Sequence, residues 1–479
     1  IEVEHHLKMQ VQDLMERVDL SDKRLRNVIY DNELLSSIGK FYAKTALQVA
    51  QFLAAYIIIS QIIFLLLYSK HKPEIISGKP KPITKKWLRD CFKRILKINY
   101  KKIYEIDVLD SLDEEYLRDT FRLLSGLNIE QHRLDLPGRL FHKLMNHDIR
   151  KLLAAFYTRP KAAELLVRLA ISSSGDTVID PACGSGTILV QAYKRKEELA
   201  KQEALHGSHH VQFCENDIWG SEIMPFGVHL TTANLASLEP QTELHETRIS
   251  EGDSLKTLQT GHHVRSGLRQ VSMELFEPVQ DPSDPESSVW KQKPGGKEVE
   301  TMKIDGGTSK TTLPTFDTVL MNPPFTKKER GKIKKLVNMK RFAHVCGDQA
   351  DLWGHFLALA DELLKEDGVV GTVIPISILR GTRGEQIKKW IWNNWTPIYI
   401  IKSTLTYAFS ENAEFRDILL IAKKRKPMLM STGLSELHEI DMAVKTIEST
   451  GNYQLIILHC IAIYPTPDKS VTSPKLNCS

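Results

Sequence analysis

The spacing of apolar residues divides the chain into two regions. Up to about residue 150, apolar residues recur at intervals of three and four, which is typical of amphipathic helices. After residue 177, short apolar runs alternate with helical stretches, which is typical of a parallel α/β sheet. We therefore predict a helical N-terminal domain over 1–150 and an α/β domain over 151–425.

Individual elements follow from the same pattern. Helical periodicity is clearest over 20–35, 87–98 and 114–124. The strand candidates are 177–180, 218–222, 318–321, 369–374, 398–401 and 418–422.

Two segments interrupt or follow the α/β pattern. Residues 277–312 contain Pro and Gly pairs and no apolar period, so we expect a flexible insertion or long loop there. The last segment, 426–479, is expected to be a short C-terminal extension with one helical stretch (436–449) and one strand-like run (453–463).

Residues 45–68 contain no charged side chain and are long enough to cross a bilayer. Polar residues interrupt the run, however, and Lys44 and Lys70 flank it symmetrically, without the charge asymmetry of a membrane span. We predict a buried helix and no membrane association.

The composition, with 42% hydrophobic and 26% charged residues, is typical of an ordinary folded globular protein. The net charge is only +5, but basic residues gather at 79–102, where Asp90 is the only acid, and at 327–341, where Glu329 is the only acid. Each cluster is either a solvated helix face or a contact for nucleic acid. The position of the second cluster, described below, favours nucleic acid.

The six cysteines are scattered, without the spacing of a zinc site or a disulfide framework, so we predict no metal. The sequence shows no signal peptide, and we expect a cytoplasmic location. The chain begins with Ile1 rather than Met, which indicates a fragment or a processed start.

A glycine loop with the sequence DPACGSGT follows the strand candidate 177–180 and precedes a helix that begins near residue 188. Glycine lets the backbone turn sharply and lets a ligand approach it closely, at the strand end where such sheets bind ligands. The loop lacks the third glycine of the dinucleotide fingerprint and the lysine of a phosphate-binding loop. A nucleoside cofactor fits better than NAD or ATP.

Acidic residues stand where the ribose and base of such a cofactor would lie. Glu222 ends the next strand candidate and can accept hydrogen bonds from both ribose hydroxyls, although Glu215 and Asp217 are nearby alternatives. Asp253 follows a short strand-like run and can accept from an adenine amino group, or it belongs to an ordinary turn.

The strand candidate 318–321 ends in Asn322, Pro323, Pro324 and Phe325. Two prolines fix the backbone, so the Asn322 amide and the Pro323 carbonyl are rigid hydrogen-bond acceptors. Acceptors that hold the hydrogens of an exocyclic amine direct its lone pair at a methyl donor, and orientation then supplies the catalysis. Phe325 can stack on a base that has swung out of a duplex.

Together these motifs resemble the amino-methyltransferases that modify adenine in DNA, and most closely the modification subunit of type I restriction-modification systems. The resemblance covers about 138–425 and includes an upstream segment, 156–160, which in that family closes over the methionine part of the cofactor. It implies a Rossmann-like S-adenosylmethionine-dependent methyltransferase sheet with a helical N-terminal domain, and transfer of a methyl group to the N6 amine of adenine.

The resemblance also implies a set of site residues. The catalytic residues would be Asn322, Pro323, Pro324 and Phe325, and the cofactor-binding residues would be Tyr157, Thr158, Pro160, Asp180, Gly184, Ser185, Gly186, Thr187, Glu222 and Asp253. The second basic cluster begins two residues after Phe325, on the side from which DNA would deliver the base, so Lys327, Lys328 and Arg330 are expected to contact phosphates.

The segment after the last predicted sheet strand is short for a target-recognition domain. Sequence specificity would then come from a separate subunit, with a restriction subunit as a further partner, or would be lost by truncation. Two alternatives stay open: the same chemistry on RNA or on a protein glutamine, and an inactive subunit that binds cofactor and DNA as an assembly platform.

Overall fold

The computed structural model describes residues 9, 13–14, 16–19, 43–98, 107–126, 158–223, 225–260, 276–281, 284–292, 297–303, 308–325, 341–347, 351–376, 378, 385–403, 409–410, 417–424, 428–431, 438, 440–441, 444–445 and 455–458. The predicted helix over 20–35 lies outside these residues.

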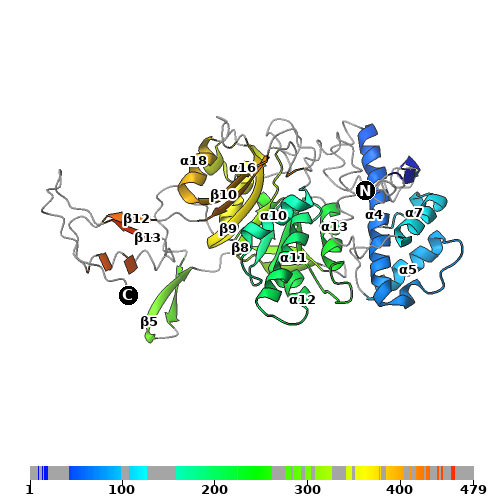
Figure 1. The fold of residues 1–479 in the computed structure, drawn as a ribbon, viewed down its shortest axis with the longest axis horizontal. Coiled ribbons are helices and arrows are strands. Elements are labelled where there is room, and N and C mark those ends of the chain that lie inside the picture. Colours follow the sequence, from blue (N-terminus) through cyan, green and yellow to red (C-terminus); the bar gives the residue numbers. More distant parts are fainter. Residues whose placement is uncertain are drawn as a thin grey trace.

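A seven-stranded sheet forms the centre of the molecule (Figure 1). Its strands stand in the order β10-β11-β9-β8-β1-β2-β3. They span β1 (Val178–Asp180), β2 (Ile218–Glu222), β3 (Arg248–Glu251), β8 (Phe316–Met321), β9 (Leu364–Pro375), β10 (Thr396–Lys402) and β11 (Asp417–Lys423). All six strand candidates named above are confirmed.

Most neighbouring strands run parallel, but β11 is antiparallel to both β9 and β10. The central strands are buried on both faces, as their continuous apolar runs predict: β11 is buried from Asp417 to Ala422 and β8 is largely buried. The predicted mainly parallel α/β architecture is confirmed.

Helices cover both faces of the sheet (Figure 1). On one face, α11 (Thr187–Gln202) packs between α10 (Pro160–Ala170) and α13 (Pro225–Ala236). On the other, α16 (Leu352–Leu363) packs against β8 and β9. Shorter helices are α12 (His210–Gln212), α14 (Ser254–Thr257), α15 (Ala343–Cys346) and α18 (Glu385–Asn394), with a π-helical turn at Phe213–Asp217.

The N-terminal region is helical where it is described. It contains α4 (Ala43–His71), α5 (Lys85–Ile98) and α7 (Glu114–Gly126), with short 3-10 turns at Pro73–Ile76 and Leu109–Ser111. Buried side chains of α4 continue into the core beneath α13, and Lys72 forms an ion pair with Glu243 at 2.8 Å. Within the described residues, no helix has both the length and the hydropathy that a bilayer crossing requires. The apolar helix α4 is instead buried against its neighbours, as expected.

The insertion at 277–312 differs from the sequence prediction of a long loop. It contains two antiparallel hairpins, β4 (Phe276–Asp281) with β5 (Asp284–Gln292) and β6 (Glu298–Met302) with β7 (Thr308–Thr312). Val299 and Thr301 of β6 are buried while Glu298 and Glu300 are exposed, so a weak two-residue alternation of β-branched side chains is enough to form a hairpin beside β3.

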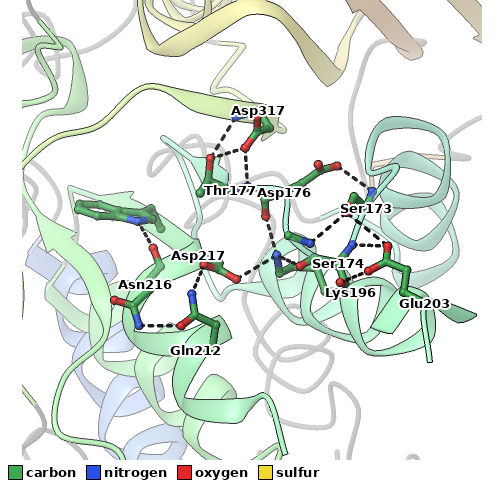
Figure 2. Close-up of polar contacts among 12 residues, drawn as sticks. Ser173, Ser174, Asp176, Thr177, Lys196, Glu203, Gln212, Asn216, Asp217 and Asp317 are labelled. Carbon is green, nitrogen blue, oxygen red and sulfur yellow. Dashed lines mark hydrogen bonds and ion pairs between the residues drawn. The ribbon is translucent and has the colours of Figure 1, made fainter. Parts of the chain in front are cut away.

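A polar cluster fixes the amino ends of β1 and β8, at the edge of the sheet opposite the glycine loop (Figure 2). Asp317 accepts hydrogen bonds from the backbone nitrogen and the hydroxyl of Thr177, at 2.9 and 2.7 Å. The fully buried Lys196 donates to the carbonyls of Ser174 and Asp176 and lies 3.2 Å from the Asp217 carboxylate. The Thr177–Asp317 bonds join the amino ends of β1 and β8, and the Lys196 bonds join α11 to the segments that precede β1 and β2.

Candidate active site

The glycine loop and the Asn322 tetrapeptide meet at one edge of the sheet. Strands β1 and β8 are parallel neighbours, with Val178 paired to Thr318 and Ile179 paired to Val319. Their carboxyl ends therefore lie side by side. The chain passes from β1 outward to β2 and β3 and then returns to place β8 on the other side of β1. That reversal of strand order is the point where open α/β sheets bind ligands.

The glycine loop is shaped by two residues with positive φ, Gly184 at +55° and Gly186 at +80°. A Cβ atom on Gly186 would lie 2.9 Å from the Thr231 side chain, so only glycine fits between the loop and α13. A Cβ atom on Gly184 would meet nothing within 4 Å. The backbone at Gly184 therefore faces open space, where a ligand can approach.

Helix α13 holds this loop through two side chains. Thr231 Oγ1 donates to the Gly184 carbonyl at 3.0 Å, and Asn234 Nδ2 donates to the Ser185 carbonyl at 2.8 Å. Neither residue was singled out from the sequence. Their positions three residues apart on one helix are the only local signal, and three-residue spacing is common on any helix face.

Glu222 is the acid that reaches the loop. Its Oε2 accepts from the Gly184 backbone nitrogen at 2.9 Å. The two alternative acids that the sequence offered bind other partners. Glu215 accepts from the His245 backbone nitrogen at 2.6 Å, and Asp217 pairs with Lys196. Glu222 is thus the one of the three acids that borders the glycine loop.

Asp180 lies beneath the loop and is buried. Its Oδ1 accepts from the Ala182 backbone nitrogen at 2.9 Å. Burial, together with the nearby negative charge of Glu222, raises the pKa of Asp180 to about 8. Asp180 therefore binds its proton more tightly than an ordinary aspartic acid does.

The remaining predicted cofactor residues lie around the same edge. Ser185 and Thr187 contact each other through their hydroxyls at 3.2 Å, and Thr187 begins α11. Asp253 caps α14 by accepting from the Leu255 backbone nitrogen at 3.1 Å. Asp253 therefore has the turn-capping role that the sequence left as one alternative, at the end of the strand next to Glu222.

Asn322 is held by residues from two distant segments. Its Nδ2 donates to Thr158 Oγ1 at 3.0 Å and to Ser410 Oγ at 3.3 Å. Thr158 and Ser410 also form an antiparallel β-bridge, and the Arg159 backbone nitrogen donates to the Phe409 carbonyl at 2.9 Å. The structure thus brings the upstream segment, which begins α10 at Pro160, into direct contact with the tetrapeptide.

A side chain that stacks on a base is expected to be exposed. The Phe325 side chain is only 6% exposed and belongs to the same hydrophobic core as Phe342 and Trp353. Pro323 is buried and Pro324 is half-buried.

The predicted DNA contacts Lys327, Lys328 and Arg330, and the predicted cofactor contact Tyr157, lie outside the described residues. Arg341, at the end of the second basic cluster, is described. It donates to the carbonyls of Leu255 and Leu258 and pairs with Glu362. Arg341 therefore stabilises the fold, and the basic run is not one uniform phosphate-binding surface.

Metal binding has no visible support in the described part of the chain, where no group of three His, Cys, Asp or Glu side chains is arranged to hold an ion. The described cysteines, Cys91, Cys183, Cys214 and Cys346, are all buried free thiols.

The strand order, with its antiparallel β11 between β9 and β10, and the glycine loop after β1 define a Rossmann-like methyltransferase class of fold. Comparison with protein families agrees. Residues 135–274 match the N-6 DNA methylase family, and residues 216–409 match the Eco57I restriction-modification methylase family. The predicted resemblance to DNA adenine-N6 methyltransferases is therefore confirmed.

Individual relatives are similar over limited lengths. The methylase subunit of the type I restriction enzyme MjaIX from Methanocaldococcus jannaschii is 30% identical over 152 residues, which are 31% of this chain and 25% of that protein. Among solved structures, the methyltransferase subunit of a type I restriction-modification system from Streptococcus thermophilus is similar. The match covers 89% of this chain and 85% of that chain, with 18% identity and a TM-score of 0.43. The chain spans a quarter or less of the length of the curated relatives it matches.

The C-terminal region matches a different family. Residues 407–476 match the NeuB family, and the spore coat polysaccharide biosynthesis protein SpsE of Bacillus subtilis is 40% identical over 47 residues, which are 10% of this chain and 13% of that protein. In this region β12 (Met428–Ser431) and β13 (Leu455–Leu458) form a separate parallel pair. Most of the predicted helix between them, and of the strand-like run to 463, lies outside the described residues.

Proposed function

We propose that this chain transfers a methyl group from S-adenosylmethionine to the N6 amino group of adenine in DNA. The observation that carries the proposal is the position of Asn322, whose side chain is fixed at the sheet edge directly beside the glycine loop. An amide next to a nucleoside-binding loop supports methylation of a planar nitrogen, and the matched families favour adenine in DNA.

The residues of the loop fit S-adenosylmethionine. The open space at Gly184 admits a ligand to the backbone, and the Glu222 carboxylate beside it has the acceptor geometry for ribose hydroxyls. Asp180 lies beneath, and with its pKa of about 8 it holds a proton near neutral pH unless the positive charge of the cofactor displaces it. When bound, the cofactor supplies an electrophilic methyl group carried on a sulfonium sulfur.

The contribution of the protein is orientation. An adenine amine is a weak nucleophile because its lone pair is conjugated with the ring. Acceptors at the Asn322 amide and the Pro323 carbonyl would hold its two hydrogens, so that the lone pair turns toward the methyl donor. Asn322 and Pro323 would hold the amine, and the glycine loop with Glu222 would hold the cofactor, which would supply the methyl group.

The proposal extends to cellular context. The names of the relatives support a restriction-modification system, in which double-stranded DNA is the substrate and separate specificity and restriction subunits are partners. A cytoplasmic location follows from such a role. Lys327, Lys328 and Arg330 remain the proposed phosphate contacts.

Two alternatives are separated from the proposal by one experiment. The purified chain is incubated with tritiated S-adenosylmethionine and, in parallel, with duplex DNA, RNA and a protein extract, with and without a specificity subunit of the same system. We expect label in DNA, lost with Asn322→Ala while cofactor binding is retained. Label in RNA or protein alone would establish the alternative substrate. Cofactor and DNA binding without transfer in any arm would indicate an assembly platform.

A further inference from the structure

Ser410 and Asp417 stand behind Asn322, and the sequence motifs had singled out neither residue. Ser410 is fully buried and Asp417 is 5% exposed. Asp417 Oδ2 accepts from the Ser410 backbone nitrogen at 2.9 Å, which places the carboxylate beside the Ser410 side chain. Ser410 Oγ in turn lies 3.3 Å from Asn322 Nδ2. Asp417 thus holds the backbone of Ser410, and the Ser410 hydroxyl contacts the tetrapeptide.

The direction of these bonds is set by Asp417. An ionised carboxylate can only accept hydrogen bonds, so the Asp417 carboxylate beside Ser410 favours a hydroxyl proton that is directed toward it. Ser410 Oγ can then only accept from Asn322, which requires the amide nitrogen, and not the amide oxygen, to face Ser410. Burial raises the pKa of Asp417, and the bonds from Ser410 oppose that shift.

The proposed reaction needs the oxygen of the Asn322 side-chain amide as an acceptor for the target amine. A side-chain amide has one carbonyl oxygen and one nitrogen, and a rotation of half a turn exchanges them. The Thr158 hydroxyl alone does not fix the orientation of the Asn322 amide, because a hydroxyl donates a hydrogen bond as readily as it accepts one. The orientation fixed by Ser410 and Asp417 is the one in which Nδ2 faces the protein and Oδ1 is directed away from Ser410.

We propose that Ser410 and Asp417 are positioning residues that set the orientation of the Asn322 amide, so that its oxygen is presented to the target amine. This inference rests on the proposed function for the identity of the amine, but the orientation itself is a property of this chain alone. Neither residue touches substrate. Both act through Asn322.

The first test measures single-turnover methyl transfer with Ser410→Ala, Asp417→Asn, the double variant and Ser410→Thr. We expect each of the first two to slow the transfer about tenfold, with unchanged affinity for S-adenosylmethionine. Because the two residues both act through Asn322, the double variant should be no slower than the slower single variant. Ser410→Thr keeps the hydroxyl and should retain most of the rate. Losses that multiply in the double variant would overturn the proposal.

A matched control is Thr318→Val, which removes another buried hydroxyl, on β8 itself, where Thr318 Oγ1 lies 3.5 Å from the Ala170 carbonyl. If this variant slows transfer as much as Ser410→Ala, the effect is a general one of lost buried hydroxyls and the proposal fails.

The second test is independent of activity and therefore of the proposed function. In protein labelled with ¹⁵N asparagine, the Asn322 side-chain NH₂ signal is assigned by its absence in Asn322→Ala. We expect its hydrogen exchange to be slow in the wild type and at least tenfold faster in Ser410→Ala and Asp417→Asn, but unchanged in Thr318→Val. Unchanged exchange in Ser410→Ala and Asp417→Asn would overturn the positioning role. A wild type that transfers no methyl group but shows the expected exchange would remove the proposed function alone.

Discussion

The Asn322 side-chain amide donates to the Thr158 hydroxyl at 3.0 Å, although the two residues are 164 positions apart in the sequence. This bond joins the segment that precedes α10 to the segment that follows β8. In the proposed mechanism it ties the part of the site that encloses the cofactor to the part that holds the target base, so that a change at Thr158 should be felt in catalysis.

Replacing Thr158 with Val removes this hydrogen-bond acceptor and keeps the side-chain volume. We expect methyl transfer to slow about tenfold, since one of the two bonds that fix Asn322 is lost. Single-turnover kinetics checks the rate. Thr158→Ser retains the hydroxyl and should be close to wild type; a Ser variant as slow as the Val variant would show that methyl packing, rather than the bond, is what matters.

Replacing Gly186 with Ala tests the fit between the glycine loop and α13. The variant combines a positive φ of +80° with a Cβ atom 2.9 Å from Thr231, and both disfavour a side chain. We expect a loss of about 1–3 kcal/mol in the free energy of unfolding, together with weaker cofactor binding. Urea denaturation measures the first and calorimetry the second.

The control is Gly126→Ala at the end of α7, where a Cβ atom meets nothing within 4 Å and φ is not positive. This change should leave both quantities nearly unaltered. A destabilisation at Gly126 equal to that at Gly186 would remove the steric argument.

Asp180 predicts a pH dependence of stability. Its folded pKa of about 8 lies above the ordinary value of 3.8, so the folded state holds a proton that the unfolded chain releases. The stability from this group is complete below the ordinary pKa and is lost as pH rises toward 8, by about 1.4 kcal/mol per pH unit. Asp180→Asn should lack this dependence, and its unfolding free energy should gain on the wild type between pH 5 and pH 8. Parallel pH profiles for the two proteins would contradict the assignment.

The buried ion pair at the opposite edge of the sheet gives a prediction about stability alone. Lys196→Met leaves the buried Asp217 carboxylate without its cation, which should cost about 3–5 kcal/mol of unfolding free energy. Adding Asp217→Asn removes the unpaired charge and should recover part of the loss. Denaturant titration of both variants tests this, and a double variant less stable than Lys196→Met would refute it.

The C-terminal segment should be separable from the methyltransferase fold. Strands β12 and β13 pair with each other and not with the seven-stranded sheet, and this region matches the NeuB family rather than a methylase. Strand β11 by contrast is central to the sheet, and Lys424 just beyond it donates to the carbonyls of Asp361 and Leu364. A chain that ends after Arg425 should keep its main thermal transition within a few degrees, whereas one that ends before Asp417 should not fold.

The sequence predicted most of what lies in single segments. The strands, the glycine loop and the Asn322 tetrapeptide each carry a local pattern, because hydrophobic period, glycine and proline act on the nearby backbone. No local sequence pattern marks the residues whose roles depend on which distant segment the sheet places beside them. These residues are Ser410, Asp417, Thr231 and Asn234. The hairpins of the 277–312 insertion were missed because the proline and glycine pairs within it outweigh a short alternation of β-branched residues.

Mass spectrometry of nucleosides from DNA incubated with the chain, S-adenosylmethionine and a specificity subunit tests the proposed methyl transfer most directly. We expect N6-methyladenine with the wild-type chain and none with Asn322→Ala. Methylated cytosine as the only product, or N6-methyladenine formed equally by Asn322→Ala, would contradict it.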